Sequence, residues 1–240
     1  MDVAMIAALR PKVIRKTLET FKKNIRYSGS FRVVAAIAPP PIGDAGVSQK
    51  DVKKLIESFY PLKAQTKGTK SHSDCQSWIW KNCDSDFFLQ WEDDWELLKP
   101  LDLDLMVETM RRRRDFAYIN FDRKEKSLLT HRPYVERHLF NKLEQGLFFR
   151  VRGKSLGGPP AIVRASYAAK AAEFIKSNEA PDRTSGTKEV QKFLRGYVIG
   201  HYIGQDGEGA IVQDIGTVWR QAKGLRKTTK LGSVRWIPAK

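Results

Sequence analysis

The order of strand-like and helix-like segments in the first 95 residues constrains the fold most. Three apolar runs are predicted as buried strands, at 3–9, 31–38 and 86–91. Three segments between them carry apolar residues at helical spacing, at 12–26, 49–58 and 71–82. Ser48 is a plausible N-cap for the second of these helices. Strands that alternate with helices in this way predict a parallel sheet with crossover helices.

The rest of the chain continues the α/β pattern with weaker signals. We expect helices at 103–114 and 161–177 and strands at 116–121, 148–151 and 197–203. A polar loop is expected at 178–187, and the stretch 220–240 has seven basic residues and no acidic ones. The 240 residues are enough for one large domain, and no repeat or clear domain boundary interrupts them.

Cysteine content and hydropathy predict a protein of a reducing compartment. Cys75 and Cys83 are the two cysteines, and their spacing supports neither a disulfide framework nor a zinc site. The sequence has no run of 18 apolar residues and no basic segment followed by a long apolar stretch. We therefore expect no membrane span and a cytoplasmic location, which is the host cytoplasm if the gene belongs to a phage. The oligomeric state cannot be read from the sequence.

Charged residues follow two of the predicted strands. Arg10 follows the first, and the cluster Glu92, Asp93 and Asp94 follows the strand at 86–91. Ligands of parallel sheets bind beyond the carboxyl ends of the strands, so these groups are expected on one rim. Neighbouring carboxylates suit Mg²⁺ or Mn²⁺, which could hold a diphosphate. The alternative interpretation is a solvated acidic loop and, for Arg10, a surface arginine at a strand–helix corner.

Four motifs in order along the chain resemble GT-A-fold, family-2-like nucleotide-sugar glycosyltransferases. The segment FFLQWEDDW (87–95) is similar to the strand and acidic DxD motif of that family. The other three motifs are ALRPKVIRKTLETF (8–21), GGPPAIVR (157–164), and Asp214-Ile215-Gly216 with Trp219-Arg220. The resemblance runs from the first strand to about residue 225. It implies a GT-A-type, Rossmann-like α/β/α sandwich in a single domain with a mostly parallel central sheet.

The same resemblance implies that different segments of the chain bind the donor and the acceptor. Residues 1–225 would form the glycosyltransferase domain, followed by a basic tail at 226–240. Within the domain, 1–95 would bind the nucleotide sugar, expected to be a UDP-sugar, and 96–225 would bind the acceptor. The acceptor side would include Gly157, Gly158 and Arg164.

The family's donor site implies roles for the charged residues of the rim. Arg10, Glu92 and Asp93 would bind the donor, with Asp93 near the ribose or the metal. Asp94 would be the direct ligand of Mn²⁺ or Mg²⁺. In the family a His often precedes Ile-Gly in the late motif, but Asp214 occupies that place here. His201 could supply the missing metal contact, although a structural histidine is the alternative.

An inverting transfer needs a carboxylate that deprotonates the attacking hydroxyl group. Related enzymes carry it after the acceptor-side helix, where Glu189 fits best and Glu179 and Asp182 are reserves. Glu189 has an ordinary alternative, because acidic residues are favourable at the start of a helix. The resemblance implies a hexosyl- or pentosyltransferase that works by metal-assisted, inverting displacement. The residues alone leave inversion or retention open, because they show no unambiguous base.

The net charge of +16 exceeds what a donor diphosphate requires. Such a charge favours a polyanionic partner and salt-sensitive binding. The basic residues near Trp219 suit a phosphate backbone with stacked bases. They are Arg220, Lys223, Arg226, Lys227 and Lys230. A solvated basic tail is the alternative.

Three functions stay open at the level of the sequence. The first is a glycosyltransferase that modifies 5-hydroxymethylated pyrimidines in DNA, as some bacteriophages require. The target base would be flipped out of the duplex or reached in the major groove. The second is a glycosyltransferase for a surface glycan, a lipid-linked acceptor or a protein. The third is a non-catalytic nucleic-acid-binding protein on this fold.

Overall fold

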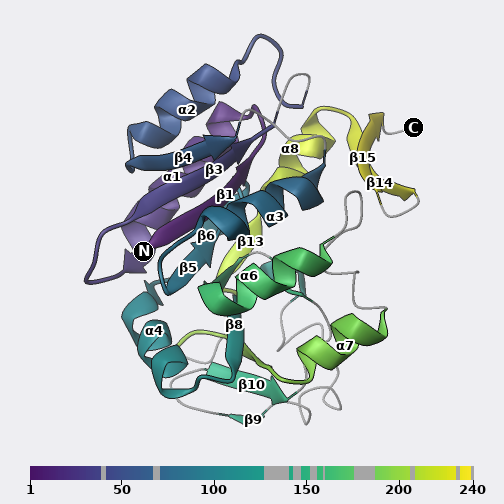
Figure 1. Cartoon of the computed structure of the whole chain (residues 1–240). Coiled ribbons are helices and arrows are strands. Elements are labelled where there is room, and N and C mark those ends of the chain that lie inside the picture. Colours follow the sequence, from purple (N-terminus) through teal and green to yellow (C-terminus); the bar gives the residue numbers. More distant parts are fainter. Residues whose placement is uncertain are drawn as a thin grey trace.

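The computed structural model of the chain describes residues 1–38, 42–66, 71–126, 141–142, 147–151, 156–158, 160–175, 187–205, 209–230 and 233–238. Figure 1 shows a layered α/β arrangement in which the first and last thirds of the chain lie side by side.

The first 95 residues form the predicted alternation of strands and helices. The strands are β1 (Asp2–Ala7), β3 (Arg32–Ile37), β4 (Leu62–Thr66) and β5 (Phe87–Gln90). The helices are α1 (Pro11–Asn24), α2 (Gln49–Glu57) and α3 (His72–Asn82). Ser48 caps α2 as predicted, since its hydroxyl group accepts a hydrogen bond from the Asp51 amide. The sequence analysis missed β4, a short, half-buried strand at the edge of the sheet.

The second part of the chain adds a mixture of strands and helices. The longer ones are α4 (Leu103–Arg112), β8 (Phe116–Phe121), β10 (Leu147–Val151), β11 (Ala161–Arg164), α6 (Ala165–Phe174), α7 (Lys188–Leu194) and β12 (Val198–Tyr202). The last segment forms β13 (Val212–Asp214), α8 (Gly216–Ala222), β14 (Leu225–Lys230) and β15 (Ser233–Pro238). The short elements are β2 (Ile25–Arg26), β6 (Trp95–Leu97), β7 (Leu101–Asp102), η1 (Lys124–Lys126) and β9 (Asn141–Lys142).

One nine-stranded sheet organises the molecule, in the order β4-β3-β1-β5-β11-β8-β12-β10-β9. Strands β4, β3, β1 and β5 are mutually parallel, and β8 is parallel to β12. Only β11 and β10 run against the others in this sheet. The predicted fold class is therefore confirmed: a mostly parallel sheet in a GT-A-type α/β/α sandwich.

The prediction of a single helix over 161–177 is wrong at its start. Residues Ala161–Arg164 form β11, which lies between β5 and β8 and pairs with both. Helix α6 begins only at Ala165. The run AIVR has apolar residues that suit a fully buried strand, and pairing on both sides outweighs the helical preference of the alanines that follow.

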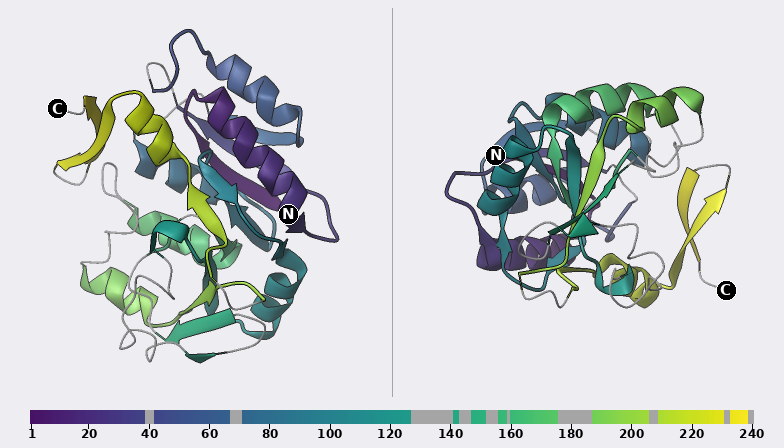
Figure 2. Two further views of the ribbon diagram at one scale, coloured as in Figure 1. Left: turned by 180° about the vertical axis from the view of Figure 1, so that it is seen from behind. Right: turned by 90° about the horizontal axis from the view of Figure 1, so that it is seen from below.

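Two apolar cores cover the two faces of the sheet. One joins α1, α2 and α4 to the sheet through residues such as Ile14, Ile56 and Met106. The other joins α3, α6 and α7 through residues such as Trp80, Tyr167 and Leu194. In the view from below (Figure 2, right), α6 and α7 lie on one side of the sheet, while α1 and α8 lie on the other.

The segment predicted as a basic tail forms an antiparallel hairpin in its described part. Strand β14 pairs with β15 in register from Leu225 opposite Pro238 to Lys230 opposite Ser233. The hairpin projects from the body beside α8 (Figures 1 and 2). In the ranges that the structure describes, no helix is long and apolar enough to cross a membrane.

Candidate functional site

The site lies where β1 and β5 end, because both strands deliver charged residues to the same edge of the sheet. Arg10 directly precedes α1, whose first residue is Pro11, a favourable position for proline. The amide of Asp93 donates to the carbonyl oxygen of Ile6 on β1 at 3.1 Å. The side chain of Thr17 on α1 donates to the Asp93 carbonyl oxygen at 2.8 Å. The predicted meeting of Arg10 with the acidic cluster is therefore present.

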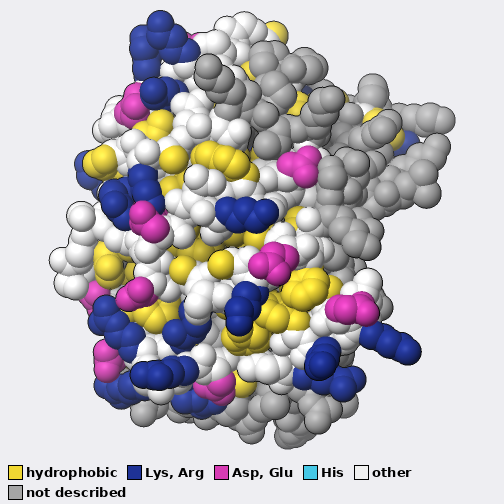
Figure 3. Space-filling view, in the orientation of Figure 1, with side chains coloured by type: hydrophobic (Ala, Val, Ile, Leu, Met, Phe, Trp, Pro, Cys, Tyr) yellow, Lys and Arg dark blue, Asp and Glu magenta, His cyan; other side chains and the backbone are white. Residues whose placement is uncertain are grey.

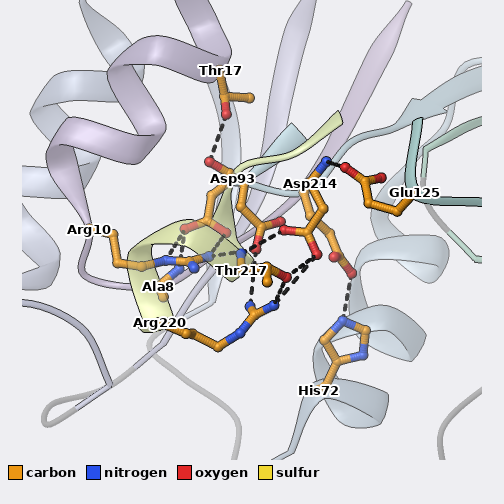
Figure 4. A network of polar contacts seen from close by, with 11 residues as sticks. Ala8, Arg10, Thr17, His72, Asp93, Glu125, Asp214, Thr217 and Arg220 are labelled. Carbon is orange, nitrogen blue, oxygen red and sulfur yellow. Dashed lines mark hydrogen bonds and ion pairs between the residues drawn. The ribbon is translucent and has the colours of Figure 1, made fainter. Parts of the chain in front are cut away.

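Arg10 and Asp93 form a buried ion pair at the centre of the site (Figure 4). The Nη2 atom of Arg10 donates to Asp93 Oδ1, and its Nε atom donates to Asp93 Oδ2 at 3.2 Å. The amide of Ala8 also donates to Asp93 Oδ2, at 2.9 Å. Both side chains are at most 4% exposed. A charge buried this deeply is costly unless it is paired, and the geometry here pairs it.

Asp94 lies between two guanidinium groups. Its Oδ2 atom is 3.2 Å from Arg10 Nη2 and 3.8 Å from Arg220 Nη1. The amide of Ile215 donates to the Asp94 carbonyl oxygen at 2.9 Å. A Cβ atom at Gly216 would lie 2.0 Å from Asp94 Oδ2, so only glycine lets helix α8 pack this close.

The electrostatics of the three central groups follow from burial and from their neighbours. Burial alone would lower the pKa of the Arg10 guanidinium, but the carboxylates of Asp93 and Asp94 raise it instead. Burial raises the pKa of Asp93, whereas Arg10 and the Ala8 amide oppose that shift. Burial, followed by the charge of Asp93, raises the pKa of Asp94 to about 7. Such a displaced pKa is typical of functional sites.

A second layer of contacts ties α8, α3 and η1 to the acids (Figure 4). Arg220 Nη2 donates to Thr217 Oγ1 at 2.6 Å and lies 3.5 Å from Asp214 Oδ2. The amide of Asp214 donates to Glu125 Oε1 at 3.0 Å. His72, in the first turn of α3, has its Nε2 atom 2.7 Å from Glu92 Oε1. Sequence reasoning missed His72 and Glu125, because nothing in their local patterns indicates contacts that lie 20 and 89 residues away. It also missed Thr217, whose partners Asp214 and Arg220 are only three residues away.

Two of the residues predicted to bind nucleic acid lie against this site. Arg220 points into the acidic cluster, and Trp219 lies under the guanidinium group of Arg10, 5.3 Å from its ring centroid. Lys223 is half exposed and pairs with Asp44 at 3.0 Å. Arg226 is exposed at the start of β14. Lys227 and Lys230 belong to β14, and their side chains lie outside the described part of the structure.

The predicted acceptor-side residues are divided between the two ends of the sheet. Because β11 is antiparallel to β5, Ala161 lies beside Gln90 and Arg164 beside Phe87. Gly157 and Gly158 precede β11 and therefore lie toward the acidic end, and Gly157 has a positive φ of 106°. Arg164 lies at the opposite end, where it donates to the carbonyl oxygens of Phe116 and Arg113 at 2.8 and 3.0 Å. That geometry makes Arg164 a structural residue.

Glu189, the one predicted base that the structure describes, is not brought to the acids. Glu189 is exposed in the first turn of α7, whose cap is Thr187. Helix α7 lies on the face of the sheet opposite α8 (Figure 2, right). Glu179 and Asp182 fall outside the described residues.

The residues present do not fit the predicted divalent metal site. Both oxygens of Asp93 already accept hydrogen bonds, and Oδ2 of Asp94 contacts two arginines. His201 lies on β12, three positions from β5 in the sheet and thus about 14 Å away. Within the described ranges, no group of three or more His, Cys, Asp or Glu side chains is arranged to hold a metal ion.

Comparison with known proteins gives structural neighbours only. No protein-family model and no curated protein sequence matches the chain. Crystal structures of S. aureus TarS residues 1–349 are similar, with a TM-score of 0.53 and 13% identity over 89% of this chain. The complex of that protein with UDP-GlcNAc gives a TM-score of 0.52 and 15% identity. The chain covers 60% and 58% of these two chains. At this identity, the likeness shows a shared fold.

Proposed function

We propose that the chain is a nucleotide-sugar glycosyltransferase. The observation that carries the proposal is the buried network of Arg10, Asp93, Asp94 and Arg220 at the carboxyl ends of β1 and β5. Ligands of open α/β sheets bind at that edge. The fold is shared with S. aureus TarS, which has been crystallised in complexes with UDP and with UDP-GlcNAc. Both facts support a nucleoside diphosphate sugar as the donor.

The reaction breaks the bond between the anomeric carbon of the donor sugar and an oxygen of the diphosphate. A hydroxyl oxygen of the acceptor forms the new bond to that carbon, and its proton passes to a base. The leaving diphosphate gains negative charge, so cations at the rim stabilise the transition state. Arg220 is the described cation that contacts the acids and is partly open to solvent, with 12% of its side chain exposed. That base must lie within hydrogen-bond reach of the attacking hydroxyl group, and Glu189 stays our proposed candidate for the role.

A polyanion is the acceptor class that the charge supports best, with DNA carrying 5-hydroxymethylated pyrimidines first. The net charge of +16 is the observation in its favour. On the face drawn in Figure 3, Lys and Arg side chains gather at the lower left, over α4. Arg111, Arg112 and Arg114 are exposed there, although acidic side chains lie among the basic ones. Salt-sensitive binding to DNA is the expected consequence.

The test is a transfer assay read by mass spectrometry. The purified chain is incubated with a panel of nucleotide sugars and DNA containing 5-hydroxymethylcytosine or 5-hydroxymethyluracil, once with Mn²⁺ and once with EDTA. The DNA is then digested to nucleosides, and the mass of each nucleoside is measured. We expect a gain of one sugar mass per modified base. Unmodified DNA of the same sequence is the control.

The remaining outcomes decide between the alternatives. Slow hydrolysis of a donor without transfer to DNA would keep the glycosyltransferase and remove the DNA acceptor, leaving a glycan, lipid-linked or protein acceptor. Binding to DNA without binding or hydrolysis of any nucleotide sugar would overturn the proposed enzyme and leave a nucleic-acid-binding protein.

A further inference from the structure

Arginine occupies the place that a divalent ion would need beside Asp94. Arg10 Nη2 is 3.2 Å and Arg220 Nη1 is 3.8 Å from the same carboxylate oxygen, Oδ2. Gly216 closes the side of that oxygen toward α8, because a Cβ atom there would lie 2.0 Å from it. Asp93 has both oxygens bonded by Arg10 and the Ala8 amide. The negative charges of Asp93 and Asp94 are therefore offset by the positive charges of Arg10 and Arg220.

The two arginines differ in how firmly they are held. Arg10 is 3% exposed, makes two hydrogen bonds to Asp93 and lies against the ring of Trp219. Arg220 is 12% exposed, and its contacts with Asp214 and Asp94 are long, at 3.5 and 3.8 Å. Its one short bond is to the neutral hydroxyl group of Thr217, at 2.6 Å. Arg10 is thus fixed to the acids, whereas Arg220 can turn toward a new anion at little cost.

We infer that Arg220 neutralises the donor's diphosphate in the role that a divalent ion would otherwise have, so that donor binding requires no metal. The inference rests on the proposed function. The planar fork of an arginine binds two phosphate oxygens at once, which suits a diphosphate. When Arg220 turns toward the diphosphate, Arg10 still balances Asp93 and contacts Asp94. Thr217 and Asp214 contact the Nη2 atom of Arg220, and these contacts are exchanged for phosphate oxygens when the fork turns.

The first measurement is binding of nucleoside diphosphates to the full chain by titration calorimetry. UDP, GDP, CDP, ADP and dTDP are each titrated in EDTA and again in Mn²⁺. We expect at least one of them to bind in EDTA, with a dissociation constant within about threefold of its value in Mn²⁺. Binding that appears only with Mn²⁺ would overturn the inference and leave the proposed function intact. Absence of binding in both conditions would overturn the proposed function itself.

The second measurement assigns the effect to Arg220. Arg220→Met should weaken binding of that diphosphate in EDTA by about tenfold or more, the loss expected for one charge-assisted hydrogen bond. Arg220→Lys keeps the positive charge but loses the planar guanidinium group. Its affinity for the diphosphate should therefore lie between those of Arg220→Met and the wild type. The matched control is Arg26→Met, because Arg26 is exposed in the short strand β2 and has no part in the proposed donor or acceptor surface. Its binding should stay within about twofold of the wild type.

Equal binding by wild type and Arg220→Met in EDTA would overturn the role of Arg220. Thermal melting of each variant shows whether it is folded. If Arg220→Met does not fold, Arg220→Lys carries the same test, and binding as tight as that of the wild type would count against the inference.

Discussion

Two buried carboxylates lie at opposite ends of the central sheet and have opposite electrostatic surroundings. Asp2 opens β1 and is 0% exposed, and Asp94 follows β5 and is 8% exposed. Lys63 Nζ and the Asp84 amide lie 3.2 and 2.9 Å from Asp2 Oδ2, and Arg32 pairs with Oδ1. Although burial would raise the pKa of Asp2, these amide and cationic partners lower it to about 2.

Asp94 is 8% exposed and contacts Arg10 and Arg220, but it also has other acids as neighbours. Burial and the charge of Asp93 raise its pKa to about 7, and Glu92 and Asp214 add to the effect. A carboxylate surrounded by donors is a structural anchor, whereas one whose ionised form is disfavoured stores energy that a ligand can release. We therefore expect Asp2 to hold the fold and propose that Asp94 serves the function.

The largest effect is expected at the functional end. Asp94→Asn should lower sugar transfer at least about a hundredfold, or about 3 kcal/mol, because both arginines lose their shared charged partner. Initial transfer rates at saturating donor measure it. Asp104→Asn is the matched control, since Asp104 is exposed on α4 and its carboxylate accepts hydrogen bonds from the amide and hydroxyl group of Ser28. Full activity in Asp94→Asn would show that the acid cluster is not the donor site.

The structural end should respond in stability and not in activity. Asp2→Asn leaves Lys63 and Arg32 without their buried partner, so the free energy of unfolding should fall by about 2 to 3 kcal/mol. Urea denaturation measures that loss. Asp84 touches the same two cations but is 68% exposed, and Asp84→Asn should cost less than about 1 kcal/mol. Lower activity per folded molecule of Asp2→Asn would contradict a purely structural role.

The smallest expected effect is on the pH dependence of stability, to which Asp2 and Asp94 contribute with opposite signs. Asp2 has a lowered pKa, so its stabilisation is complete above pH 3.8 and is lost as the pH falls through about 2. The expected loss is about 1 to 2 kcal/mol. Asp94 has a raised pKa, so its contribution is complete below pH 3.8 and is lost as the pH rises through about 7.

Urea denaturation of the wild type, Asp2→Asn and Asp94→Asn between pH 2 and 8 measures both trends. The stability difference between the wild type and Asp2→Asn should shrink below pH 4. The wild type should lose stability relative to Asp94→Asn between pH 4 and 7. If the free energy of unfolding changed with pH in the same way in all three proteins, the predicted electrostatic difference between Asp2 and Asp94 would be wrong.

The rim of the sheet was predictable from the sequence. Apolar runs mark β1, β3 and β5, and the charged residues directly after β1 and β5 must meet because parallel strands share an edge. That argument placed Arg10 beside Asp93 without any knowledge of the fold's details. It could not give the protonation behaviour of Asp94, which depends on how completely the later segments cover it.

The partners from later segments were not predictable in the same way. Arg220 was expected on a nucleic-acid surface, because Lys and Arg cluster near it in the sequence. In the structure α8 turns it toward Asp94 and Asp214. Glu125 meets Asp214 across 89 residues of sequence, and His72 meets Glu92 across 20. Such contacts depend on tertiary packing, for which local spacing carries no signal.

The close fit of Gly216 against Asp94 has a consequence for the order in which the protein becomes competent. During synthesis, Arg10 and then Asp93 leave the ribosome with the strands that precede them, well before residue 216 is made. The sheet can begin to form at that stage, but Asp94 gains its second guanidinium partner only when α8 docks. Under the proposed function, recognition of the donor therefore requires the segment that carries α8.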